Sequence, residues 1–408
     1  MVLYAFLALV AAGTLATLAD WRAGIYWMIV IGTLQDPARK MVPGAPVYFV
    51  LSTAPLWCAM ILGAVGARPG AVAVFRRGFP RLNRAFGAFL LMLLPSAAIS
   101  FFYGEGSWKV ALLGAFFYMT PILGFQLGYS LPRRESDLAN IARFYCLVTA
   151  LALSGILLEQ ERVFPGWAAL GTGVLGTRWI RYIPGVQVEM LSGFYRSPDI
   201  MGWHATTVAL LGGAMALAAR GARRLFWVCV CGWAGLGLMV CGRRKMVYMI
   251  PFCVAIVLWL QWRSRHGGRR VAAGLVTLAA VVLVAAFVLG QAGIGQEYNV
   301  YYLSTLGDVV ERTYEHGYMA TVYTIVNQAG FFGVGLGTTQ LGARFLDAEK
   351  PRVWQEGGAS KLAAEVGVFG LIAFAMLGLA IGRELLRLLQ DLPMRRPGDY
   401  LASVLGAA

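Results

Sequence analysis

Residues 200–262 read IMGWHATTVALLGGAMALAARGARRLFWVCVCGWAGLGLMVCGRRKMVYMIPFCVAIVLWLQW, and this stretch decides the fold class. It holds three apolar runs, near 200–219, 225–241 and 246–262, separated by short clusters of arginine and lysine. Each run approaches or reaches the ~17–25 residues that a helix needs to cross a bilayer. Continuous apolar runs indicate spanning helices, whereas a membrane β-barrel would show weakly alternating segments.

The same pattern repeats along all 408 residues, of which 59% are hydrophobic and only 13% charged. A soluble domain carries about a quarter charged residues, so a soluble enzyme and a disordered chain are excluded. We expect an all-α polytopic membrane protein with about 11 (10–12) transmembrane helices, in a single integral-membrane helical domain over 1–408. The predicted spans lie near 2–19, 23–34, 44–66, 86–102, 108–131, 144–158, 200–219, 225–241, 246–262, 271–290 and 361–382. No basic stretch precedes residues 2–19, which indicates a retained helix and not a signal peptide.

The net charge of +15 does not indicate nucleic-acid binding, because the basic residues lie in short loops between apolar runs. By the positive-inside rule, the arginine-rich loops and the C-terminal tail 383–408 are cytoplasmic. This orientation places the N-terminus outside, provided that 23–34 crosses the membrane. The loop arginines are Arg68, Arg76, Arg77, Arg81, Arg84, Arg133, Arg134, Arg143, Arg220, Arg223, Arg224, Arg263, Arg265, Arg269, Arg270, Arg383, Arg387, Arg395 and Arg396.

The opposite side carries two long segments, 159–199 and 291–360, which mix acidic, basic and aromatic residues. Long connections inside a compact protein are uncommon unless they are functional. We therefore expect the chemistry on the outer face of the membrane.

The cluster Arg243-Arg244-Lys245 breaks the charge pattern, because it lies between two spans on the predicted outer side. Charges near membrane depth are costly and are usually functional. Arginine forks match phosphate oxygens and lysine adds a point charge, so the cluster predicts an anion site that fits a diphosphate. The alternative is that the cluster is cytoplasmic, which requires the loss of a neighbouring span.

The first outer segment ends in Arg196 and the triplet Ser197-Pro198-Asp199, which is typical of a helix start. His204 follows one turn later, where a packed histidine is the more common outcome. The segment 308–327 has helical periodicity. Its Arg312 is either an anion ligand or a solvated surface charge, and His316 beside Glu315 is either a base or an exposed loop residue.

Three charged residues lie close to the last span: Glu356, Lys361 and Glu365. Glu365 falls at membrane depth and needs a partner, for which Lys361 at i−4 or an arginine of another helix is expected. The sequence GVGLGT at 333–338 lacks the preceding strand and the lysine of a nucleotide loop, so its glycines indicate a tight turn or a close backbone approach. The surrounding piece, 329–341, is too short to cross and is either re-entrant or on the surface. The few histidines and their spacing predict no metal site.

Three of these segments together resemble the bacterial O-antigen ligase and polysaccharide polymerase superfamily, over roughly residues 85–385. CGRRKM at 241–246 is similar to the family's arginine signature at the end of a span, with Arg244 as the match. RTYEHGYMATVYTIVNQAGFFGVGLGT at 312–338 is similar to the arginine–aromatic helix followed by a glycine turn, with Arg312 as the match. EGGASKLAAEVGVFG at 356–370 resembles the stretch in which ligases carry a histidine nine residues before a glutamate. In this chain Glu356 stands at the position of that histidine, and Gly357 stands at the position of the asparagine that follows it. In the earlier segment, Asp199 stands where the family usually has asparagine. The chain therefore resembles a divergent branch of the family.

The resemblance implies a metal-independent glycosyltransferase that uses no cofactor. A glycan on undecaprenyl diphosphate would bind through Arg244 and Arg312, and Glu356 would be the base that activates the acceptor hydroxyl. Further substrate contacts are expected from Arg243, Lys245, Arg196, His316, Lys361 and Glu365. The acceptor would be a glycan, a lipid or a protein, next to membrane lipids and a glycan-assembly complex.

Two alternatives belong to other classes. One is a transporter of lipid-linked glycan, although the chain has no internal repeat and its polar residues gather at the outer face. The other is a structural partner in a glycan-assembly complex, which the glutamate at the histidine position keeps open.

Overall fold

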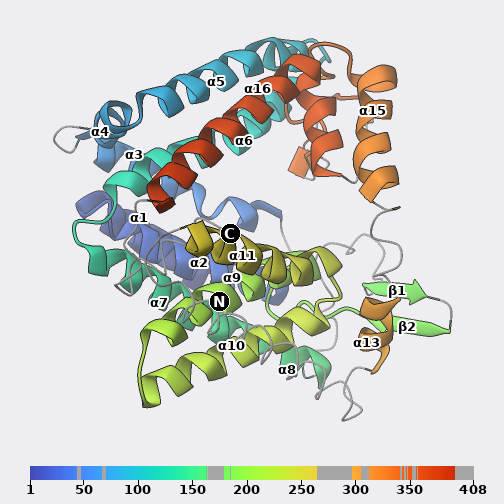
Figure 1. The fold of residues 1–408 in the computed structure, drawn as a ribbon. Coiled ribbons are helices and arrows are strands. Elements are labelled where there is room, and N and C mark those ends of the chain that lie inside the picture. Colours follow the sequence, from blue (N-terminus) through green and yellow to red (C-terminus); the bar gives the residue numbers. More distant parts are fainter. Residues whose placement is uncertain are drawn as a thin grey trace. The chain divides into compact units, whose positions relative to one another are not determined.

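The computed structural model describes residues 1–43, 47–66, 70–161, 163, 179–183, 185–263, 296–304, 311, 313–340, 342–343, 346, 348–351, 355 and 357–390. The regular structure of these residues is almost entirely helical, with one two-stranded hairpin (Figure 1). The chain divides into two compact units. Unit 1 comprises 1–64, 132–304 and 386–408, and unit 2 comprises 65–131 and 305–385.

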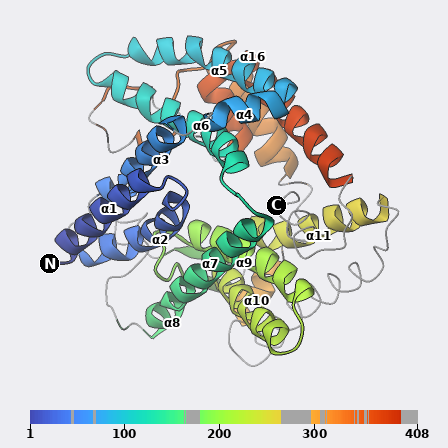
Figure 2. The ribbon, with the colours of Figure 1, turned by 90° about the vertical axis from the view of Figure 1, so that its left-hand side faces the viewer.

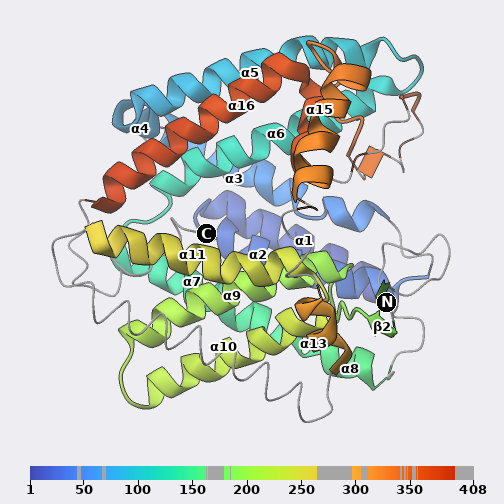
Figure 3. The same cartoon turned by 45° about the vertical axis from the view of Figure 1, so that its right-hand side comes forward.

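Unit 1 is built around α9, a helix of 21 residues against which α7, α10 and α11 pack. Figures 2 and 3 show α7, α9 and α10 lying side by side. The helices of this unit are α1 (Val2–Ala19), α2 (Gly24–Met41), the 3-10 turn Val47–Leu51, α3 (Ala54–Gly66, to residue 64), α7 (Glu135–Leu153), α8 (Gly155–Gln160), α9 (Pro198–Ala218), α10 (Ala222–Val240), α11 (Arg244–Arg263) and α13 (Gln296–Leu303). Strands β1 (Ile180–Ile183) and β2 (Val186–Glu189) pair antiparallel and precede α9.

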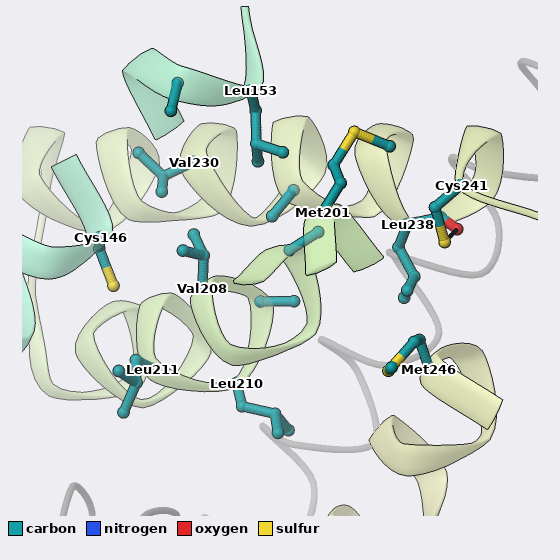
Figure 4. Close-up of a cluster of buried hydrophobic side chains, with 14 of the residues drawn as sticks. Cys146, Leu153, Met201, Val208, Leu210, Leu211, Val230, Leu238, Cys241 and Met246 are labelled. Carbon is teal, nitrogen blue, oxygen red and sulfur yellow. Dashed lines mark hydrogen bonds between the residues drawn. The ribbon is translucent and has the colours of Figure 1, made fainter. Parts of the chain in front are cut away.

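The core of unit 1 forms where α9 meets its neighbours. Leu153, Met201, Val208, Val230 and Leu238 come from α7, α9 and α10 and are buried together (Figure 4). Of the apolar window of α9, 72% is buried, against 22–39% for the other candidate spans. α9 is therefore the central helix, and the residues at its start are held by the packing of the whole unit.

Small residues on α9 allow this close packing. A Cβ on Gly202 would lie 2.7 Å from the sulfur of Cys241, and one on Gly212 would lie 3.0 Å from the sulfur of Cys231. Helix pairs in membranes approach closely through such small residues, because contact area and not water release stabilises them. Gly202 thus brings the beginning of α9 against the residues that connect α10 to α11.

Unit 2 contains α4 (Ala71–Gly78), α5 (Pro80–Phe101), α6 (Ser107–Ser130), α15 (Ala320–Thr324) between two π-helical stretches (Thr313–Met319 and Ile325–Ala329), and α16 (Gly358–Gln390, to residue 385). The last of these is interrupted at Gly367, which has a φ of 67° and a ψ of −166°. The interruption frees the backbone N–H groups of Val368 and Phe369, which donate to the carbonyl oxygens of Gly330 and Phe331.

The glycine-rich segment 333–338 docks among α5, α6 and α16, and its residues 335–338 are buried. A Cβ on Gly337, whose φ is 83°, would lie 2.1 Å from the carbonyl oxygen of Val110. Leu336 N–H donates to the carbonyl of Ser96, and Val334 N–H donates to that of Ala364. The prediction of a close backbone approach is confirmed, whereas the choice between a re-entrant and a surface position for 329–341 stays a prediction.

Eight described helices are long and apolar enough to cross a membrane: 2–19, 48–66, 80–101, 107–130, 136–160, 198–218, 222–240 and 358–388. They confirm an all-α, multi-pass membrane protein but not the predicted number of about 11. α2 includes Asp36, Arg39 and Lys40 and is not among the eight, nor is α11. The span predicted at 271–290 lies outside the described residues.

Candidate functional site: a cationic cluster in unit 1

The predicted basic residues of unit 1 gather where α9 and α11 begin. The start of α9 is as the sequence predicts: the Ser197 hydroxyl accepts a hydrogen bond from Ile200 N–H, Pro198 opens the helix and Asp199 lies in the first turn. The proline has no N–H to leave unpaired there, and the carboxylate complements the helix dipole.

Asp199 joins two members of the basic cluster. Its carboxylate lies 2.7 Å from an Nη of Arg243 and 3.2 Å from Nζ of Lys245. The Arg243 side chain is only 12% exposed, whereas that of Lys245 is 70% exposed. Arg243 is therefore the fixed member of the cluster, and Lys245 is the member that extends into the surroundings.

Aromatic rings hold both arginines. The guanidinium carbon of Arg243 lies 4.9 Å from the ring centre of Trp179, and that of Arg244 lies 4.0 Å from the ring centre of Tyr301. Arg244 also donates a long hydrogen bond of 3.5 Å to the Tyr301 carbonyl. A planar guanidinium over a ring is restrained in orientation, so the forks are arranged before any ligand binds.

The cluster carries excess positive charge. Burial lowers the pKa of Arg243 from its ordinary value, the carboxylate of Asp199 opposes this shift, and Arg181 adds to it. The N-termini of α9 and α11 add partial positive charge at the same end. This end of unit 1 therefore suits an anion with several oxygens.

Arg196 lies just before α9 at the same end, and its backbone N–H donates to Oδ2 of Asp36, 3.0 Å away. The sequence analysis did not predict a role for Asp36. It also did not predict one for Lys40 and Glu159, which form hydrogen bonds with the backbone of residues 192 and 193. The prediction ended the helix at residue 34, whereas α2 continues to Met41. The signal was present in the sequence as the charged stretch QDPARK that follows the apolar residues.

Basic residues lie near both ends of α10. Arg223 and Arg224 are in its first turn, and Arg243 follows its last residue, Val240. An uninterrupted helix of 19 residues is about 28 Å long at ~1.5 Å per residue. α10 is long and apolar enough to cross a membrane, whereas α11 is not among the eight candidate spans, so the side of the membrane on which residues 243–245 lie stays a prediction.

The predicted residues of unit 2 form a different arrangement. Glu365 is fully buried, and its Oε1 accepts hydrogen bonds from the backbone N–H and hydroxyl of Thr339 (3.0 and 2.7 Å) and from the amide of Gln340 (3.2 Å). Among the residues that the structure describes, Glu365 forms no ion pair with Lys361 or an arginine, contrary to the prediction. Neutral donors of the segment that follows the glycines satisfy Oε1, whereas Oε2 is buried without a hydrogen-bond partner among the described residues.

His316 is exposed on the π-helical stretch that precedes α15, and its carbonyl oxygen would lie 3.2 Å from a Cβ on Gly357. On the same stretch, the rings of Tyr314 and Tyr318 stack with their centres 5.8 Å apart. Lys361 lies one turn into α16. In unit 1, His204 is packed against the ring of Tyr195, with centres 4.9 Å apart, as predicted for a satisfied histidine.

Arg312 and Glu356 lie outside the described residues. The predicted convergence of Arg312 with Arg244, and the role of Glu356 as a base, therefore stay predictions. No family model, curated protein or solved structure matches the chain.

Proposed function

We propose that the protein is a membrane glycosyltransferase of the O-antigen ligase or polysaccharide polymerase kind. It moves a glycan from a polyprenyl-diphosphate carrier to an acceptor hydroxyl on the outer face of a bacterial inner membrane. The observation that carries this proposal is the cluster of Arg243, Arg244 and Lys245, arranged by Trp179, Tyr301 and Asp199 at the end of unit 1 where two helices begin. The resemblance of CGRRKM to the family's arginine signature supports it.

The chemistry follows from where charge develops. When the acceptor hydroxyl attacks the anomeric carbon, the bond to the carrier breaks and its electrons move onto the diphosphate. Preorganised cations that face this leaving group stabilise the transition state more than the ground state. Arg244 over Tyr301 supplies a restrained fork, and the exposed Lys245 supplies a mobile charge.

The remaining roles come from the resemblance alone. Arg312 would add a second arginine to the diphosphate, and Glu356 would take the proton of the acceptor hydroxyl. His316 is exposed and Glu315 is its neighbour. Either residue could act as the base in place of Glu356. Glu365 already has three hydrogen bonds to its Oε1, so a structural role suits it better than a substrate contact.

The first experiment tests transfer. Purified protein is given lipid-linked glycan extracted from the source cells, and release of polyprenyl diphosphate is followed. We expect Arg244→Ala to abolish transfer and Arg244→Lys to restore it only in part, because lysine lacks the planar fork. Arg223→Ala, an exposed arginine at the far end of α10, is the matched control. Binding of the lipid-linked glycan without turnover by wild-type protein would favour the transporter or structural alternative.

The second experiment tests the side of the membrane. In intact spheroplasts, Lys245→Cys should react with a membrane-impermeant thiol reagent, because Lys245 is 70% exposed. The signal is compared with that of Arg223→Cys, which should react only after lysis. Labelling of position 245 only after lysis would overturn both the topology and the outer-face site.

A further inference from the structure

Unit 1 contains a second set of charged side chains, which the proposed chemistry does not use. Asp36 and Arg39 near the end of α2 are 2% and 9% exposed, and Lys40 is partly buried beside them. Glu159 comes from the last turn of α8. Taking charges out of water costs several kcal/mol per ion, and charges near membrane depth usually have a function.

Two of these side chains, Lys40 and Glu159, form hydrogen bonds with the same stretch of backbone at Ser192 and Gly193. Oε2 of Glu159 accepts hydrogen bonds from the N–H groups of Ser192 (2.8 Å) and Gly193 (2.5 Å). Nζ of Lys40 donates to the Gly193 carbonyl at 2.5 Å and lies 3.4 Å from the Ser192 hydroxyl. The peptide groups around Gly193 are thus fixed by an anion on their N–H side and a cation on their carbonyl side.

The backbone at Gly193 is also restrained by its conformation and its close contact with α8. Gly193 has a φ of 54°, and a Cβ there would lie 3.0 Å from the backbone nitrogen of Ile156 in α8. Two residues later the Tyr195 ring is buried against His204. Asp36 then holds the N–H of Arg196.

This stretch leads directly into α9, whose first turn carries Asp199. Arg196 is partly exposed, and it is separated by only two residues from Asp199, which binds Arg243 and Lys245. Because so few residues separate 192–193 from α9, we expect the position of this backbone to influence Arg196 and the start of α9. An apolar pair could fill the same space without the cost of buried charge, but it could not fix the direction of the peptide groups.

We propose that Lys40 and Glu159 are positioning residues, which clamp the backbone of Ser192 and Gly193 so that Arg196 and the first turn of α9 face the diphosphate of a lipid-linked ligand. This inference rests on the proposed function and adds Arg196 as the side chain through which the clamp acts. Lys40 and Glu159 themselves need not touch the ligand.

The test measures binding of farnesyl diphosphate to the full chain in detergent by calorimetry. We expect Glu159→Gln and Lys40→Met each to weaken binding by about tenfold, by analogy with the lower end of the losses seen when residues that orient metal ligands are replaced. Glu161→Gln, an exposed glutamate two residues from Glu159, is the matched control and should keep wild-type affinity.

A double-mutant cycle separates positioning from general stability. If the clamp acts through Arg196, the pair Glu159→Gln with Arg196→Ala should bind no more weakly than Arg196→Ala alone. Hydrogen exchange of the peptide 190–198 should quicken in Glu159→Gln while the thermal midpoint stays close to that of wild type. Lys40→Arg keeps the charge and should recover part of the affinity if Lys40→Met folds poorly.

The outcomes are distinct. If wild-type protein fails to bind farnesyl diphosphate, the proposed function and the clamp proposal are both overturned. If wild type binds and Arg196→Ala weakens binding, but the clamp variants keep full affinity, only the clamp proposal is overturned. Losses that add fully in the double variant, or that simply follow a lower thermal midpoint, assign Lys40 and Glu159 a structural role and also overturn it.

Discussion

Replacement of Glu365 distinguishes a structural carboxylate from a substrate ligand. In Glu365→Ala, the N–H and hydroxyl of Thr339 and the amide of Gln340 lose their common acceptor inside unit 2. In Glu365→Gln, the side-chain carbonyl can take the place of Oε1 and accept the same three hydrogen bonds. The two variants should therefore behave very differently.

The magnitude follows from the number of donors. A buried donor left without an acceptor costs about 1–3 kcal/mol, and Thr339 and Gln340 are only partly buried, so the three together should cost about 3–5 kcal/mol. That is a large part of the ~5–15 kcal/mol by which a folded protein is stable. The glutamine variant keeps the acceptor and should lose less than about 1.5 kcal/mol, the net value of one hydrogen bond.

Thermal unfolding in detergent, followed by the fluorescence of the tryptophans, measures the difference. Thr339→Ala removes the hydroxyl donor, so in the Glu365→Ala background it should cost less than it does in wild type. Equal losses of stability in the glutamine and alanine variants would refute the acceptor argument. So would a Glu365→Gln protein that folds normally but cannot transfer glycan, because that result would require the negative charge itself.

Three further outcomes are expected. Burial lowers the pKa of Lys40 to about 8 although Glu159 and Asp36 oppose the shift, so unfolded chains bind more protons than folded ones between pH 8 and 10.5. Stability should accordingly rise with pH by about 1.4 kcal/mol from pH 7 to 9, and urea unfolding should show this rise in wild type but not in Lys40→Met. Gly202→Val should lower the thermal midpoint by several degrees more than Gly232→Val, because a Cβ at 202 meets the sulfur of Cys241 whereas one at 232 meets open space; similar midpoints would contradict the close packing of α9. Trp179→Ala should weaken farnesyl diphosphate binding by a few-fold in calorimetry through loss of the ring over Arg243, whereas unchanged affinity would show that the ring does not restrain it.

Hydropathy alone predicts most of the helices, because length and apolar composition are local properties. The start of α9 was equally accessible, since Ser197, Pro198 and Asp199 act on the same helix turn. The hairpin of β1 and β2 was missed, although Pro184-Gly185 between two alternating segments is a turn signal.

Hydrogen-bond partners that come from distant segments of the chain could not be predicted from the sequence. Glu365 accepts from residues 25 and 26 positions earlier, and they are neutral, so a search for opposite charges pointed to Lys361. The clamp of Lys40 and Glu159 joins residues that are more than 100 positions apart in the chain. Only packing places such groups together, and an apolar pattern contains no information about their pairing.

The break at Gly367 divides α16 into parts with separate registers. Residues before it are aligned by the glycine-rich segment, through the hydrogen bond from Val334 to Ala364, and residues after it begin anew from the carbonyls of Gly330 and Phe331. In a continuous helix, one inserted residue rotates everything beyond it by about 100°. Here the two parts of α16 have separate hydrogen bonds to the glycine-rich segment, so the later part can change its rotation at Gly367 without displacing Glu365. The lipid-facing surface of this helix can therefore change during evolution without altering the interior residues at its beginning.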